Sequence, residues 1–214
     1  VAMSESDKKE MQKLVPKLSI DIVPNGIDTK FYSEFRKEKK YPPRVLYVGF
    51  FSWLQNVEAA EILALKVWPK IKKEIHNAKL WIVGKNITER IKSLASEDIE
   101  ITESIPDIRE AYRGSSVLVA PIKGPGGTRL KILEAMASSL PVVTTSVGAE
   151  GLGINDSEQA LIRNDIPGIA NAAVNILRNE NLAKGLGEKG KEFVQKNYAW
   201  EENADLLDKM YKEM

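Results

Sequence analysis

Short apolar segments alternate with longer amphipathic segments along most of the chain, starting at residue 44. The apolar segments are rich in Val and Ile and are too short for buried helices, so they predict strands. We expect six strands, at residues 44–49, 79–84, 99–102, 117–121, 141–145 and 160–163. The intervening and following segments have the composition and apolar spacing of helices, at 57–75, 88–95, 106–112, 128–137, 167–178, 182–196 and 200–212.

This alternation predicts an α/β protein with a doubly wound, parallel, Rossmann-like sheet. Ligands bind such sheets at the carboxyl ends of the strands. Turn segments should meet at this edge, namely Gly49, Gly84, Ser104–Ile105, Gly124–Thr128 and Ser146–Gly148. Turn glycines without a shared function would be scattered over both edges of the sheet. The convergence of these turns on one edge therefore indicates a site for a ligand of the nucleotide type.

The residues before the sheet predict a separate segment. A helix should begin after Ser4 or Ser6, and a strand at 18–23 should end at the turn formed by Asn25 and Gly26. The charged segment 36–43 ends in two prolines and predicts a linker.

Two positions around residue 55 bear on the site. Asn56 is a residue type that caps helices well, so we expect it to cap the helix at 57–75. Phe51 and Trp53, in the loop before it, could stack on a base or sugar, although packing in the core or between domains is their more common use.

The glycine-rich loop at 124–128 carries the main chemical signal. It joins the apolar strand at 117–121 to a run of good helix formers. Such a turn leaves free backbone N–H groups at the positive end of a helix dipole, where phosphate groups bind. Glycines let the backbone approach a ligand closely. From the glycines alone, a tight strand-to-helix turn that binds nothing is an equal alternative.

The helix after this loop places candidate side chains beside the predicted anion site. Leu130, Leu133 and Ala137 form an apolar stripe on an ideal helix. Lys131 and Glu134 lie next to one another, so Glu134 could accept hydrogen bonds from ribose hydroxyls, or the two could form an ordinary surface ion pair. On an ideal helix Arg129 points about 160° away from Lys131, which makes it the weaker candidate for a phosphate contact.

Composition and charge narrow the possible classes. The chain has 214 residues, a net charge of +1, no cysteine and one histidine, His76. The balance of charge favours neither a nucleic-acid binder nor an acidic partner, and disulfides, thiolate metal sites and histidine clusters are excluded. No apolar run approaches the roughly 18 residues of a membrane span, and no signal peptide is visible. We therefore expect a cytoplasmic protein with no bound metal.

Several spaced motifs resemble one enzyme family. Residues 127–137 (GTRLKILEAMA) are followed by 141–145 (PVVTT) and 148–152 (GAEGL), and 23–28 (VPNGID) and 47–49 (YVG) precede them. In this order they are similar to the nucleotide-sugar domain of retaining family 4 glycosyltransferases, which have the GT-B fold.

The resemblance implies a fold, a ligand and a set of roles. It implies the C-terminal half of a GT-B fold that binds a nucleoside-diphosphate sugar, UDP or GDP, as substrate without a further cofactor. The candidate catalytic residues are Lys131 and Glu134, with Lys131 neutralising the leaving group and Glu134 on the ribose. The candidate donor-binding residues are Gly49, Gly84, Ile105, Gly124, Gly126, Gly127, Thr128, Arg129, Lys131 and Glu134.

The same resemblance implies a division of the chain. Residues 1–41 would be the end of an acceptor domain and the interdomain linker, 42–198 the Rossmann-like donor-binding domain, and 199–214 a C-terminal crossover helix. The chain begins at Val1, and an N-terminal acceptor-binding domain is expected as its missing partner.

One position departs from the family pattern. The family commonly has two glutamates eight positions apart, and the upstream one falls at Gly126 here, so its usual role at the donor sugar is unassigned. A nucleotide-sugar epimerase of the same fold and a non-catalytic binding module remain alternatives. A dehydrogenase is disfavoured because the loop after the first strand lacks the G-x-G-x-x-G spacing.

Overall fold

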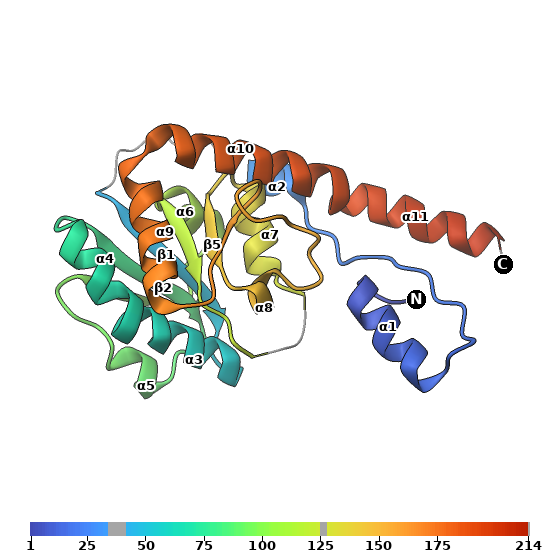
Figure 1. Ribbon diagram of the computed structural model, residues 1–214, viewed down its shortest axis with the longest axis horizontal. Helices are drawn as coiled ribbons and strands as arrows, with labels where there is room; N and C mark the ends of the chain where they lie inside the picture. Colours follow the sequence, from blue (N-terminus) through green and yellow to red (C-terminus); the bar gives the residue numbers. More distant parts are fainter. Residues whose placement is uncertain (34–41, 125–127, 214) are drawn as a thin grey trace.

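The computed structural model describes residues 1–33, 42–124 and 128–213, and this part contains a six-stranded parallel sheet between two layers of helices (Figure 1). The strands are β1 Arg44–Phe50, β2 Lys79–Lys85, β3 Ile99–Glu103, β4 Val117–Ala120, β5 Val142–Thr144 and β6 Leu161–Ile162. Their order in the sheet is β3-β2-β1-β4-β5-β6. The predicted doubly wound, Rossmann-like sheet is confirmed, and its order reverses between β1 and β4.

Helices cover both faces of this sheet. The longer ones are α1 Glu5–Leu14, α3 Leu54–Ile62, α4 Trp68–Glu74, α7 Leu130–Ala137, α9 Ile166–Arg178, α10 Glu180–Asn197 and α11 Trp200–Glu213. The shorter ones are α2 Thr29–Ser33, α5 Glu89–Lys92, α6 Ile108–Arg113 and α8 Ser146–Ala149.

Alternation along the strands divides the core into two layers. Val45 and Tyr47 of β1 pack in a cluster with α3, α4 and α9. Leu46, between them, packs on the other face with α6, α7 and α10. Successive strand side chains point to opposite faces, so β1 supplies both layers. Full burial of each aliphatic side chain contributes about 1.5–3 kcal/mol.

The predicted helix at 57–75 starts earlier and is interrupted. α3 begins at Leu54 and its N-cap is Trp53, so the prediction that Asn56 caps it is wrong. The Asn56 side chain instead donates from Nδ2 to the carbonyl of Phe50 at 2.9 Å. A π-helical turn, η1 Leu63–Val67, separates α3 from α4. Pro69 follows it; proline lacks an N–H, and its ring clashes with the carbonyl four residues earlier unless the helix widens.

The segment before the sheet contains less strand structure than predicted. Residues 18–23 form no strand, because their pairing is a single bridge between Ile22 and Ala2. Farther along, Ile27 donates its N–H to the carbonyl of Tyr198 at 2.8 Å and accepts from Trp200 at 3.2 Å. This segment is therefore tied to the start of α11, which projects beyond the sheet (Figure 1).

The close approach of β1 and β2 gives a direct test of the fold. A Cβ at Gly84 would lie 1.8 Å from the carbonyl oxygen of Gly49, and neither backbone can move without breaking the sheet. We expect Gly84→Ala to lower the free energy of unfolding by roughly 3 kcal/mol, the upper end for overpacking, as measured by urea denaturation.

Gly185 in α10 provides the matched control. A Cβ there would meet nothing within 4 Å, and alanine is the better helix former. Gly185→Ala should raise the free energy of unfolding by about 0.5–1 kcal/mol. Equal effects of the two substitutions would contradict the β1–β2 packing described here.

Candidate functional site

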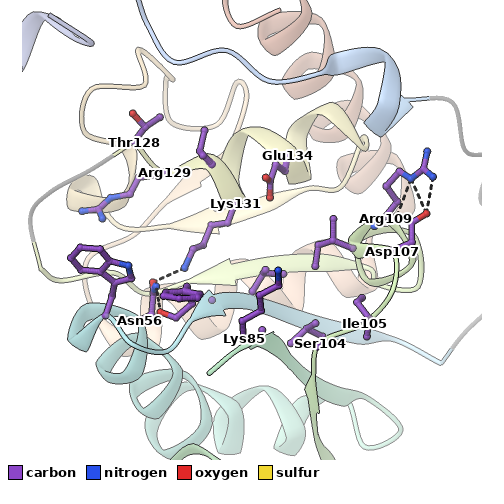
Figure 2. Close-up of a pocket in the computed structure, with 18 of the residues that line it drawn as sticks. Asn56, Lys85, Ser104, Ile105, Asp107, Arg109, Thr128, Arg129, Lys131 and Glu134 are labelled. Carbon is purple, nitrogen blue, oxygen red and sulfur yellow. Dashed lines mark hydrogen bonds and ion pairs between the residues drawn. The ribbon is translucent and has the colours of Figure 1, made fainter. Parts of the chain in front are cut away.

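A cavity of about 1210 Å³ opens where the carboxyl ends of β1 and β2 meet the start of α7 (Figure 2). It lies at the reversal of the strand order, where doubly wound sheets bind ligands. Three further segments complete its wall, namely Asn56 and its neighbours in α3, residues 104–109 and Phe31 of α2. Its volume suits a ligand of nucleotide size.

Most of the predicted donor-binding residues meet in this cavity. Its wall includes Gly49, Gly84, Ile105, Thr128, Arg129, Lys131 and Glu134. Gly124 lies beside it and acts through its carbonyl, which accepts a hydrogen bond from Arg129 Nη2 at 2.7 Å. Gly126 and Gly127 lie outside the described residues.

Lys131 extends from α7 across the cavity toward α3 (Figure 2). Its Nζ donates to Asn56 Oδ1 at 2.7 Å and to the hydroxyl of Tyr47 at 3.2 Å, and it lies 4.5 Å from the centre of the Tyr47 ring. Burial and then the charge of Arg129 lower the pKa of Lys131 to about 7. The amine is thus held by neutral groups beside a second cation, an arrangement that an anionic ligand would relieve.

Arg129 does not follow the ideal-helix prediction. α7 begins at Leu130, and Arg129 is its N-cap with φ −82° and ψ 60°, so the 100° spacing of a helix does not apply to it. Its side chain is 8% exposed and lies along the cavity. The expectation that Arg129 points away from the site is therefore wrong, and both cations face the same space.

Glu134 occupies the middle of the same wall. Its Oε2 accepts a hydrogen bond from the hydroxyl of Tyr112 at 2.6 Å. The Lys131 amine and the Glu134 carboxylate bond different partners, which disfavours the surface ion pair considered from the sequence. Leu130 was expected in the apolar stripe of α7, but as its first residue it is 41% exposed and lines the cavity.

The structure adds Lys85, and several contacts and conformations that the sequence pattern did not predict. Lys85 directly follows Gly84 and brings a further lysine to the cavity, and its place after a predicted strand end was the available signal. Asn56 and Tyr47 act through Lys131, a contact between distant segments that no local pattern reveals. Ser104 has φ +55°, a backbone conformation rare outside glycine, and sits on the cavity wall.

The two aromatic residues of the loop after β1 separate in the structure. Phe51 is 1% exposed and packs in the core, whereas Trp53 is 59% exposed at the rim of the cavity. The core role is confirmed for Phe51. Trp53 is left with a free face for a ligand or a partner.

Charge and polarity change in order along the cavity (Figure 2). Thr128 and Arg129 lie at one end, Lys131 and Glu134 follow along α7, and Ser104 and Ile105 lie toward the other end. Cations bind phosphate, a carboxylate binds sugar hydroxyls, and an apolar wall covers a base. The cavity therefore offers cations and a carboxylate along α7, and an ion pair between Asp107 and Arg109 lies at the end that holds Ser104 and Ile105.

Two features are absent from the described residues. Within ranges 1–33, 42–124 and 128–213, no helix is both long and apolar enough to cross a membrane. The same ranges contain no group of three or more His, Asp or Glu side chains arranged to hold a metal ion.

The fold and the cavity define a Rossmann-like domain of the kind found in GT-B glycosyltransferases. The sequence profile of the family described as Glycosyl transferases group 1 matches residues 42–179. The chain belongs to this glycosyltransferase family.

Two relatives illustrate its place there. An uncharacterized 44.6 kDa protein in the cps region of Klebsiella pneumoniae is 28% identical over 200 residues, which are 89% of this chain and 51% of that protein. A phosphatidyl-myo-inositol mannosyltransferase of Mycobacterium leprae is 25% identical over 219 residues, which are 99% of this chain and 58% of that enzyme. The chain thus spans little more than half the length of these relatives.

Solved structures show the same fold. Sucrose-phosphate synthase from Thermosynechococcus elongatus matches with a TM-score of 0.78 and 24% identity, covering 99% of this chain and 57% of that one. HepE of Anabaena, in complex with UDP and glucose, matches with a TM-score of 0.78 and 11% identity, covering 100% of this chain and 62% of that one.

The lowered pKa of Lys131 predicts a pH-dependent cost to stability. Its pKa is about 7 in the folded chain and 10.5 as the reference value. Below pH 7 the amine is charged in both the folded and the unfolded chain, so folding buries a charge and the loss of stability is at its full size. The loss becomes smaller as the pH rises and disappears near pH 10.5, where the unfolded chain also releases the proton. Lys131→Met should therefore raise the free energy of unfolding relative to wild type by roughly 1–3 kcal/mol more at pH 6 than at pH 9.

Urea unfolding of both proteins at the two pH values measures this difference. The exposed Lys123 supplies the matched control, since Lys123→Met removes a solvated charge and should give the same difference at both pH values. A Lys131→Met effect that does not change with pH would contradict the buried position of the amine.

Proposed function

We propose that this chain is the donor-binding domain of a retaining glycosyltransferase that uses a nucleoside-diphosphate sugar, with UDP or GDP as the nucleotide. The observation that carries the proposal is the pair of cations, Arg129 and Lys131, that face one cavity at the strand-order reversal. Both described hydrogen-bond partners of Lys131 are neutral, so its charge is available to a ligand. Membership of the family and the UDP complex of a protein with this fold support the choice of ligand.

In this proposal the diphosphate lies between Arg129 and Lys131. Negative charge grows on the diphosphate as the bond to the sugar breaks, and fixed cations in a partly dry cavity stabilise that charge. Gly126 and Gly127 would add backbone N–H groups from the loop before α7, as the sequence predicts. Lys85 would extend the positive wall from β2.

The nucleoside would occupy the rest of the cavity. Glu134 would accept hydrogen bonds from the ribose hydroxyls, and the base would lie against Ile105. Ser104 donates its N–H to the carbonyl of Gly84 at 2.9 Å, which holds this wall against β2. Backbone groups here would contact the base, with Gly49 and Gly84 leaving room above the strands.

The acceptor would bind between this domain and a second one. The chain spans 51% and 58% of the two relatives described above, which is consistent with a partner domain on the N-terminal side. We assign residues 1–41 to the end of that domain and the linker, 42–198 to the donor-binding domain and 199–214 to a crossover helix. The contacts of Ile27 with Tyr198 and Trp200 support this division, since they join the linker to the crossover.

Calorimetric titration of the chain with UDP, GDP and ADP separately tests the proposal. A donor-binding domain should bind one of these nucleotides and discriminate among them. A binding module in which the loop is only a strand-to-helix turn should bind none of them, and this result would overturn the proposal.

The role of Glu134 predicts a selective loss of affinity. Glu134→Gln should weaken nucleoside-diphosphate binding by roughly 1–3 kcal/mol, the scale of a lost charge-assisted hydrogen bond. Glu110, exposed on α6 and absent from the cavity wall, gives the matched control, and Glu110→Gln should bind as wild type does. Equal affinity of both variants, with unchanged melting curves, would remove Glu134 from the site.

The lowered pKa of Lys131 predicts that the chain takes up a proton when it binds a nucleoside diphosphate. With a pKa of about 7 in the free chain, a large fraction of the amine is neutral at pH 8, and a bound diphosphate favours the charged form. Affinity should therefore fall as pH rises from 7 to 9, by up to about tenfold per pH unit. Titrations in buffers of different ionisation enthalpy measure the proton uptake, which Lys131→Met should abolish.

A further inference from the structure

Glu134 is held by groups that lie outside the nucleotide cavity. The hydroxyl of Tyr112, on α6, donates to Glu134 Oε2 at 2.6 Å. The ring of Tyr112 is 1% exposed, so packing on all sides fixes the position of this donor. One oxygen of the carboxylate thus has a rigid partner in the absence of any ligand.

A second tyrosine, from the segment before the sheet, lines the same small cavity as Glu134. Tyr32, in α2, packs edge-on against Tyr112 with ring centroids 5.9 Å apart and planes at 76°. Burial and, after it, the Glu134 carboxylate raise the pKa of the Tyr32 phenol, and the same causes act on Tyr112. Both phenols therefore stay protonated, and the Tyr112 hydroxyl remains a hydrogen-bond donor to Glu134.

The direction from which these donors approach matters for the ligand. Glu134 lies on the wall between the large cavity and a neighbouring one of about 800 Å³, and it lines both. Tyr32 lines the neighbouring cavity, and neither of these two described tyrosines lines the large one. The Tyr112 hydroxyl therefore reaches the carboxylate without occupying the space of the nucleotide.

This arrangement leaves acceptor capacity on the side of the large cavity. An ionised carboxylate has about four lone-pair sites, of which the Tyr112 hydroxyl uses one. A free glutamate side chain at a cavity wall would lose rotamer entropy when it orders on a ligand, at a cost of roughly 1–2 kcal/mol. A carboxylate already fixed from behind avoids most of that cost.

We propose that Tyr112 and Tyr32 are positioning residues that fix the Glu134 carboxylate in the orientation that receives the ribose hydroxyls. This inference rests on the proposed function. It adds two residues, from α6 and from α2, to the determinants of nucleotide affinity. It also makes the segment before the sheet a part of the ribose site.

The test compares two ligands on hydroxyl-deleted variants. The ligands are the nucleoside diphosphate that wild type binds and its 2′,3′-dideoxy counterpart, which cannot donate to Glu134. Tyr112→Phe and Tyr32→Phe keep the rings and remove only the hydroxyls. Tyr211→Phe, at a tyrosine that is 69% exposed on α11, is the matched control.

We expect each of the two variants to weaken binding of the nucleoside diphosphate about tenfold and to leave binding of the dideoxy ligand unchanged. In a Glu134→Gln background, Tyr112→Phe should have no further effect, since the group it positions is altered. The control should bind both ligands as wild type does. Melting curves establish whether each variant is folded. If Tyr112→Phe does not fold, the comparison of the two ligands on Tyr32→Phe tests the inference.

Other outcomes overturn the inference. An equal loss for both ligands would assign the tyrosines a general structural role, and no loss for either would show that Glu134 is positioned without them. In both cases wild type still binds the nucleoside diphosphate, so the proposed function stands. A wild-type chain that binds neither ligand would overturn the proposed function and this inference together.

Discussion

The site depends on the reversal of strand order between β1 and β4. Successive crossovers leave these two strands toward opposite faces of the sheet, so the loops after them separate and open a crevice. β1 and β2 run side by side in register through Gly49 and Gly84, where a side chain on Gly84 would collide with the carbonyl of Gly49. The floor of the cavity at Gly49 and Gly84 is therefore backbone, and its charged groups come from the surrounding helices and loops and from Lys85 at the end of β2.

These groups favour ligand binding at the expense of stability. Arg129 and Lys131 share one wall, and the charge of Arg129 adds to the effect of burial in lowering the pKa of the Lys131 amine. The segment before the sheet contacts the loop before α7 and the middle of that helix: Asn25 Nδ2 donates to Thr128 Oγ1 at 2.6 Å, and Tyr32 and Glu134 line one small cavity. The geometry of the cavity thus depends on residues that precede the sheet as well as on the sheet itself.

The sheet and the helices were predictable because strand and helix periodicities are local and the apolar runs are clear. The edge at which the cavity opens followed from topology, whereas the roles of Lys131 and Glu134 came from the family resemblance and stay predictions. The errors have two causes. Arg129 was placed on an ideal helix, whereas α7 begins one residue later and leaves Arg129 as its N-cap. Asn56 and the strand at 18–23 were assigned from local rules, whereas distant residues decide them: Lys131 bonds Asn56, and the only pairing described for 18–23 is the bridge from Ile22 to Ala2. Tyr32 and Tyr112 could not be found from sequence for the same reason.

A crystal structure of the chain with its preferred nucleoside diphosphate tests the central claim most directly. The account predicts phosphate oxygens within about 3.5 Å of Lys131 Nζ and the Arg129 guanidinium, and ribose hydroxyls within hydrogen-bond distance of Glu134. It also predicts the base against Ile105. A nucleotide bound in the reverse direction, or outside the cavity at the β1–β4 reversal, would contradict it.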